Sequence, residues 1–232
     1  MRMKKIIKKV FVILLIPFLL GLNSCKGKEV TVAEAKEIWK DILEYQEEHK
    51  EELEKMSFEF DYKLVRTMQE RTATNIRKQK KDEDTIYSYS YFSISDEEPD
   101  EKETCLYVKD GKYYRDGNET TQEDFLMMNQ VIISPIHLFQ FNIENMIRLA
   151  SIENPDASVG EYKFYSKGEG NLTVVAIEHT NGMDGYDPNT TANIELTFSD
   201  YVFSSYKCIF TSPEEKWEAT EKAKYNVKVK NK

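Results

Sequence analysis

Glycine and proline are scarce in this sequence, with 9 and 6 residues among 232. The scarcity excludes a collagen-like chain, and the 40% of hydrophobic residues excludes an intrinsically disordered one. A chain of this length can bury one good core or two small ones. Because no glycine- or serine-rich linker and no repeat interrupts it, we predict a single domain over residues 31–232.

Basic residues are too few to suggest a nucleic-acid partner. The first 24 residues hold five of the 32 lysines and arginines and no acidic residue. In the rest of the chain 27 basic residues face 41 acidic ones, a balance of −14. Nucleic acids are held by clustered lysines and arginines, so we expect no nucleic-acid binding.

Motifs of catalysis and metal binding are missing as well. His49, His137 and His179 show no zinc-ligand spacing. The sequence has no Gly-x-Ser-x-Gly elbow and no P-loop, and its many carboxylates single out no glycosidase pair. We therefore expect a protein that is not an enzyme and that uses no metal and no cofactor.

The N-terminus has the pattern of an export signal. A cationic run over residues 1–9 precedes thirteen apolar residues at 10–22, too few to cross a bilayer that needs about 20. The run ends in Leu22-Asn23-Ser24-Cys25, which resembles the lipobox of bacterial lipoproteins. The alternative is an ordinary secretory signal in which Cys25 is incidental.

The lipobox resemblance implies cleavage before Cys25 and diacylation of that residue, for example with palmitate. Residues 1–24 are then a lipoprotein signal peptide and residues 25–30 a lipidated tether. Two acyl chains anchor a protein stably where one would not. We expect the mature chain in the cell envelope, anchored to the membrane on its extracytoplasmic side. The remaining cysteines, Cys105 and Cys208, lie in strand-like runs, and either a disulfide or two separate thiols is open.

Residue periodicity predicts the elements of the N-terminal half. A capping box at Thr31 and Glu34 opens an amphipathic helix over about 31–55. The period changes to two at residues 58–64, which predicts a half-buried strand, and residues 86–94 form another. Two charged stretches, 77–84 and 96–103, are interpreted as a separator and an exposed turn. A hairpin is expected at Asp110-Gly111, where both turn residues need positive φ.

The second half of the sequence is expected to begin with helices and to end in strands. Residues 125–150 are apolar without alternation, which predicts two or three short helices. The chain then returns to strands, joined mostly by turns, so the sheet should be antiparallel. These strands are predicted at 162–165, 172–179, 192–198, 201–211 and, with Trp217, Ala219, Ala223 and Tyr225 on alternate positions, 217–229.

This order of elements resembles the outer-membrane-lipoprotein carrier superfamily, which is LolA/LolB-like and includes LppX-type lipoproteins. The resemblance covers most of residues 31–212. It rests on the lipobox, the helix before the strand at 58–64, the hairpin at 106–114, the Met- and Phe-rich centre, and the hairpin at 194–210. It implies an α+β fold: a curved antiparallel half-barrel whose concave face is covered by an N-terminal helix and a central helical insert.

The resemblance also implies a hydrophobic cavity between the sheet and the helices. Methionines suit such a variable apolar surface because they are flexible and polarizable. The expected lining residues are Phe58, Phe60, Tyr62, Leu64, Met127, Met128, Phe139, Met146, Ile194, Leu196 and Phe198.

The leading functional hypothesis is an anchored lipoprotein that binds or carries a lipid or a lipidated client in this cavity. The alternative is a structural or interaction lipoprotein with a filled core and a protein or glycan partner. A glycan would stack on Tyr87, Tyr89 and Tyr91, which share one strand face. We favour a core position for these three side chains.

Overall fold

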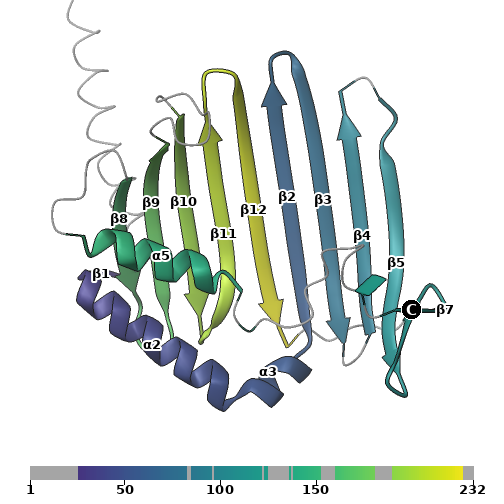
Figure 1. Cartoon of the computed structure of the whole chain (residues 1–232), viewed down its shortest axis with the longest axis horizontal. Coiled ribbons are helices and arrows are strands. Elements are labelled where there is room, and N and C mark those ends of the chain that lie inside the picture. Colours follow the sequence, from purple (N-terminus) through teal and green to yellow (C-terminus); the bar gives the residue numbers. More distant parts are fainter. Residues whose placement is uncertain are drawn as a thin grey trace, which may run out of the picture.

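One curved, open antiparallel sheet of 12 strands carries the fold (Figure 1). The computed structural model describes residues 26–82, 85–95, 97–121, 123–124, 136, 138–152, 160–180 and 190–226. Neighbouring strands follow the order β1-β8-β9-β10-β11-β12-β2-β3-β4-β5-β6-β7. Because β12, the last strand, pairs with both β11 and β2, it joins the two halves of the chain into one sheet.

Several strands, such as β2 and β5, are longer than the sequence predicts. The strands are β1 (Lys28–Val30), β2 (Phe58–Met68), β3 (Arg71–Asp82), β4 (Thr85–Ile94), β5 (Asp100–Lys109), β6 (Lys112–Arg115), β7 (Asn118–Thr120), β8 (Gly160–Ser166), β9 (Leu172–Thr180), β10 (Thr190–Ser199), β11 (Val202–Thr211) and β12 (Glu215–Tyr225). The helices are α2 (Val32–Glu48), α3 (Lys50–Lys55) and α5 (Gln140–Ala150).

The expected α+β class is therefore wrong, because the chain is mainly β. Strands hold 59% of the described residues and helices 21%. An open half-barrel fits the curved sheet, but the helices are a minor part of it. Of the central helical insert, the described residues contain α5 and two helical positions at 123–124, while residues 125–135 lie outside the description.

Two charged stretches account for much of this error. The predicted separator at 77–84 belongs to β3 up to Asp82, and the predicted turn at 96–103 gives way to β5 at Asp100. Polar side chains occupy both faces of these strands, so no apolar alternation marks them in the sequence. The hairpin at Asp110-Gly111 is confirmed, with φ values of 52° and 72°.

Helix α2 starts as predicted, at a complete capping box. The Glu34 backbone N–H donates to the Thr31 hydroxyl at 3.2 Å, and the Thr31 N–H donates to the Glu34 carboxylate at 2.7 Å. Its buried stripe contains Ala35, Trp39 and Ile42. Helices α2 and α5 lie on the same face of the sheet, over β8 to β11 (Figure 1), and we call this the helix face. The opposite side is the outer face.

The turn between β10 and β11 fixes the C-terminal end of α2. The buried Gln46 side chain donates to the Tyr201 carbonyl at 2.7 Å, and the Tyr45 ring stacks on the Tyr201 ring at 3.9 Å. Gly170 lies beneath, at a φ of +67°, where a Cβ atom would come within 2.7 Å of the same ring. These contacts hold the helix against one end of the sheet.

The expected tether is partly a strand. Residues Lys28–Val30 form β1 and pair antiparallel with β8, where Val30 lies opposite Phe164. Residues 1–25, including the signal segment and Cys25, lie outside the described part of the chain. None of the helices described here has the length and apolarity to cross a bilayer.

The two described cysteines do not form the disulfide that the sequence left open. Both Cys105 and Cys208 are free thiols. Cys105 lies on β5 and Cys208 on β11, with four strands between them. Five strand steps amount to roughly 24 Å along the sheet, whereas a disulfide needs Cα atoms within about 7 Å. The fold therefore keeps Cys105 and Cys208 as two separate thiols.

The packing of α2 against β10 allows a first prediction about stability. Phe198 is fully buried on β10, and its ring meets the edge of Trp39 at 4.9 Å. Phe198→Ala leaves a cavity between α2 and the sheet, so we expect it to lower the free energy of unfolding by about 3–5 kcal/mol in urea denaturation. The control Asn193→Ala, exposed on the same strand, is expected to change it by less than about 0.5 kcal/mol.

Candidate functional site

Most of the residues predicted to line a cavity are core residues. Six of the eleven are at most 8% exposed and belong to one hydrophobic cluster with α2: Phe58, Phe60, Met146, Ile194, Leu196 and Phe198. Tyr62, Leu64 and Phe139 are half-buried. Met127 and Met128 lie outside the described residues. Under α2 and α5, the side chains of the sheet and of the helices therefore pack directly against each other.

Phe139 marks the border of this packed region. It immediately precedes α5, at a φ of 58°, and its ring stacks on Phe203 at 4.8 Å and on Tyr206 at 4.9 Å. Beyond it the helix face continues across β12, β2, β3, β4 and β5. Phe139 therefore lies where the apolar cluster, which also includes Phe58 and Phe60 on β2, meets more polar side chains of the same face.

Polar side chains form one row across that second part of the helix face. The register places Glu221 opposite Tyr206 and Tyr62, and Arg77 opposite Tyr62 on the next strand. We call the row that the pairing defines the polar row: Tyr206, Glu221, Tyr62, Arg77, Ser90 and Lys102. It runs from β11 to β5, and all members except the exposed Lys102 are half-buried.

The charges within the polar row interact. The Arg77 guanidinium lies over the Tyr62 ring, 5.4 Å from its centroid. Burial raises the pKa of the Glu221 carboxyl to about 7, although the nearby Arg77 acts in the opposite direction. Burial also raises the pKa of Tyr62 and of Tyr206. A carboxyl group that titrates near neutrality beside a cation is a candidate for binding.

A second acid–phenol pair lies nearer the β1 edge of the same face. The Tyr162 hydroxyl donates to the Glu178 carboxylate at 3.3 Å. Burial raises the pKa of both groups, while the hydrogen bond from Tyr162 lowers that of Glu178. Ionisable groups are therefore drawn into the helix face on both sides of the packed core.

Apolar side chains border the polar row. Leu64 lies two residues from Tyr62 on β2 and is half-buried. Phe92, 46% exposed, shares its row across Asn75 of β3. Trp217 on β12 stacks on Phe210 at 5.0 Å. This part of the helix face thus presents an apolar strip, interrupted by Asn75, beside the polar row.

The apolar alternation of residues 217–225 is a feature of the sequence that could have identified Glu221. The alternation over 217–225 places Trp217, Ala219, Ala223 and Tyr225 on one face, and Glu221 occupies the same phase. A charged residue in an apolar phase indicates a special position. Arg77 gave no such signal, because it opens the charged run 77–84 interpreted as a separator.

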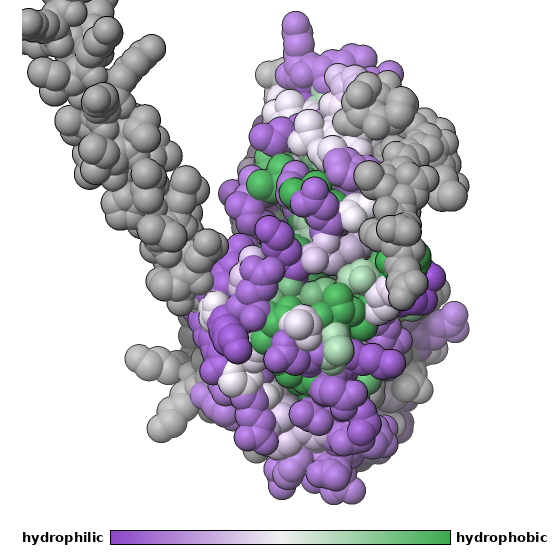
Figure 2. Space-filling view, turned by 90° about the vertical axis from the view of Figure 1, so that its left-hand side faces the viewer, coloured by the Kyte–Doolittle hydropathy of each residue, from purple (hydrophilic) through white to green (hydrophobic). Residues whose placement is uncertain are grey.

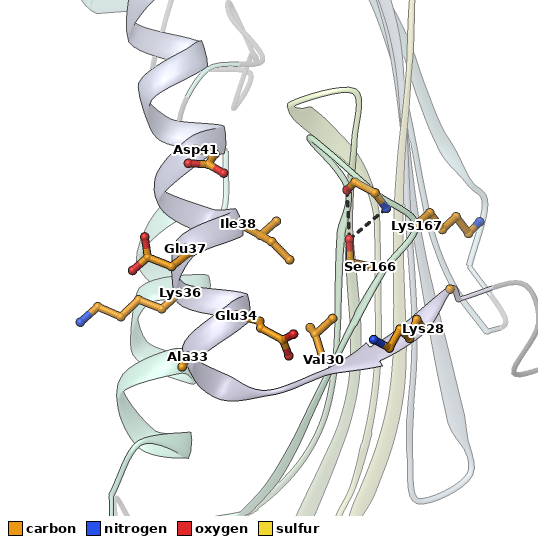
Figure 3. A pocket seen from close by; sticks show the side chains of 12 residues that line it. Lys28, Val30, Ala33, Glu34, Lys36, Glu37, Ile38, Asp41, Ser166 and Lys167 are labelled. Carbon is orange, nitrogen blue, oxygen red and sulfur yellow. Dashed lines mark hydrogen bonds between the residues drawn. The ribbon is translucent and has the colours of Figure 1, made fainter.

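A separate pocket of about 1120 Å³ lies between α2 and the β1 edge (Figure 3). Val30 and Ile38 point into it, Lys28 and Glu34 flank it, and Ser166 closes the far side. Figure 2 views this end of the molecule and shows hydrophobic residues gathered at its centre within a hydrophilic surround. This pocket is not the predicted cavity. Residues of β1, of α2 and of the turn after β8 line it, and none of them was among the predicted lining residues.

No protein-family model matches this sequence, and no curated protein matches it. Among solved structures, a redesigned β-barrel, mFAP1, bound to DFHBI, is 10% identical with a TM-score of 0.18, covering 70% of this chain and 91% of that one. A DUF1329 family protein from Desulfovibrio piger is 10% identical with a TM-score of 0.23, covering 84% and 95%. Similarity at this level carries no functional inference. Within the described ranges, no cluster of three or more His, Cys, Asp or Glu residues could hold a metal.

The raised pKa of Glu221 predicts how stability depends on pH. The folded carboxyl keeps its proton up to about pH 7, whereas the unfolded one releases it near 4.5, so ionisation in this window costs folding free energy. Glu221→Gln removes that cost. The difference in unfolding free energy, variant minus wild type, should rise between pH 4.5 and 7.5 by more than about 0.5 kcal/mol in urea titrations.

Glu218→Gln is the matched control, because Glu218 lies on the outer face of the same strand and pairs with Lys207 at 3.1 Å. Its difference from wild type should stay flat over this pH range. An equal rise in both variants would contradict a special environment for Glu221.

Proposed function

We propose that this chain is an exported, membrane-anchored binding protein that holds an amphiphile, either a lipid or a lipid-modified client, on its helix face between Phe139 and β5. The observation that supports the proposal is the pair of adjacent strips on that face. One strip carries half-exposed Leu64 and exposed Phe92, and the other is the polar row. A ligand with an alkyl part and a polar part matches both strips at once.

Each strip has a separate role in binding. Alkyl chains gain about 25 cal/mol for each Å² that they withdraw from water against Leu64, Trp217 and Phe92. The polar part meets the cations Arg77 and Lys102 and the acid Glu221. Mostly apolar sites with a few fixed polar groups are typical for small ligands. No bond is made or broken in this role.

The anchor is the second half of the proposal. Cys25 directly precedes Lys26, which pairs with Glu195 at 2.7 Å, and β1 begins two residues later. Acyl chains on Cys25 would hold the α2 and β1 end of the molecule next to the bilayer. The surface in Figure 2 would then face the membrane.

Replacement of the anchor residue tests this half. In cells fed an alkyne-tagged palmitate, Cys25→Ser is expected to abolish labelling of the full-length chain and to move it out of the membrane fraction. Cys105→Ser, which removes a free thiol on β5, is the control and should leave both readouts unchanged. Undiminished labelling of Cys25→Ser would contradict acylation at this position.

Lipid content tests the binding half. Wild-type chain purified from membranes is expected to retain phospholipid or fatty acid, quantified by mass spectrometry after extraction. Leu64→Gln should reduce the retained amount at least fivefold, because it places an amide in the apolar strip. Val65→Gln, its neighbour on the outer face, is the matched control. Equal lipid in both variants, or none in the wild type, would favour an interaction lipoprotein with a filled core.

A further inference from the structure

The outer face of the sheet changes character at β4. On β2 and β12 its residues are largely charged, such as Asp61 and Lys222. On β4 three consecutive outer positions are Tyr87, Tyr89 and Tyr91. The core position favoured for these tyrosines is wrong, because the buried Ile86 of the same strand faces the other way.

Two more tyrosines extend this surface onto β5 and β6. Tyr107 and Tyr114 are paired across these strands, and their rings stack at 4.9 Å with an angle of 8°. We call the five residues the tyrosine patch: Tyr87, Tyr89, Tyr91, Tyr107 and Tyr114. None of them belongs to either hydrophobic core cluster, Tyr87 is 46% exposed and the others are half-buried.

Charges flank the three tyrosines of β4 evenly. Lys78 and Lys80 of β3 lie opposite Tyr89 and Tyr87, while Glu103 and Glu101 of β5 lie opposite Tyr89 and Tyr91. Two positive charges on one side match two negative ones on the other, and Lys80 is paired with Glu59 at 2.7 Å. Charges of both signs therefore border the rings, which suits a neutral partner rich in hydrogen-bonding groups.

The spacing of the rings favours an extended partner. Strand residues rise by about 3.4 Å each, so alternate side chains repeat at roughly 6.8 Å and the three rings span roughly 14 Å. The three tyrosines of β4 are therefore a line of aromatic groups, with Lys78 and Lys80 on one side and Glu101 and Glu103 on the other.

We propose that the tyrosine patch binds a neutral oligosaccharide. A pyranose ring offers a face of C–H groups with partial positive charge, which matches the negative face of an aromatic ring. Its hydroxyl groups reach outward, toward the tyrosine hydroxyls and the lysines and glutamates that edge the patch. A linear chain of sugars can place successive rings along β4. This site lies on the face opposite the proposed lipid site, so neither depends on the other.

Calorimetric titration of the full-length chain tests the inference with four probes: the hexaoses of β-1,4-linked N-acetylglucosamine and of β-1,4-, β-1,3- and α-1,4-linked glucose. At least one probe should bind, and Tyr89→Ala should weaken that binding tenfold or more. Tyr89→Phe, which keeps the ring, should retain most of it. Tyr165→Ala is the matched control, because Tyr165 lies on the outer face of β8, far from the patch.

Three outcomes would overturn the proposal. The first is no binding of any of the four hexaoses by the wild type. The second is equal weakening by Tyr89→Ala and Tyr165→Ala, which would place the sugar elsewhere. The third is dimerisation in analytical ultracentrifugation that Tyr89→Ala removes, which would assign the patch to contact between copies of the chain.

Discussion

The apolar side of a wide open sheet has to be covered, and this constraint shapes the rest of the molecule. Eleven steps between twelve strands make a sheet roughly 53 Å wide. Helix α2, with 17 residues, is only about 26 Å long. Together with α5 it covers the sheet from β8 to β11. The main apolar cluster of the helix face lies there and extends to Phe58 and Phe60 on β2, while the row from Glu221 to Lys102 is polar.

The boundary between the apolar cluster and the polar row has the chemical features of a binding site. Phe139 stacks on Tyr206, and the row of residues that starts at Tyr206 continues across the sheet through Glu221, Tyr62 and Arg77. Side chains at such a border are partly withdrawn from water, and partial burial is what raises the pKa of Glu221 to about 7. On the outer face, no helix among the described residues covers β4, where three tyrosines stand in line.

Local signals in the sequence predicted the elements that obey local rules. The capping box at Thr31, the helix stripe on α2, the alternation at residues 58–64 and the Asp110-Gly111 turn each depend on a few neighbouring residues, and each has the expected structure. The strand β3 and the first part of β5 were missed because polar side chains occupy both of their faces there. The α+β expectation failed with them, since strands that look like linkers reduce the predicted share of sheet.

The sequence by itself determined where strands with an apolar phase run and where α2 begins, because those features follow from periodicity and backbone hydrogen bonding. It also contained the lipobox-like segment ending at Cys25, on which the proposed anchor rests. Only the tertiary structure decided which strands are neighbours. The pairing of β12 with β2 brings Glu221 beside Tyr62 although the two residues are 159 positions apart in the chain. That proximity comes from backbone hydrogen bonds between distant strands, and no local pattern of residues encodes it.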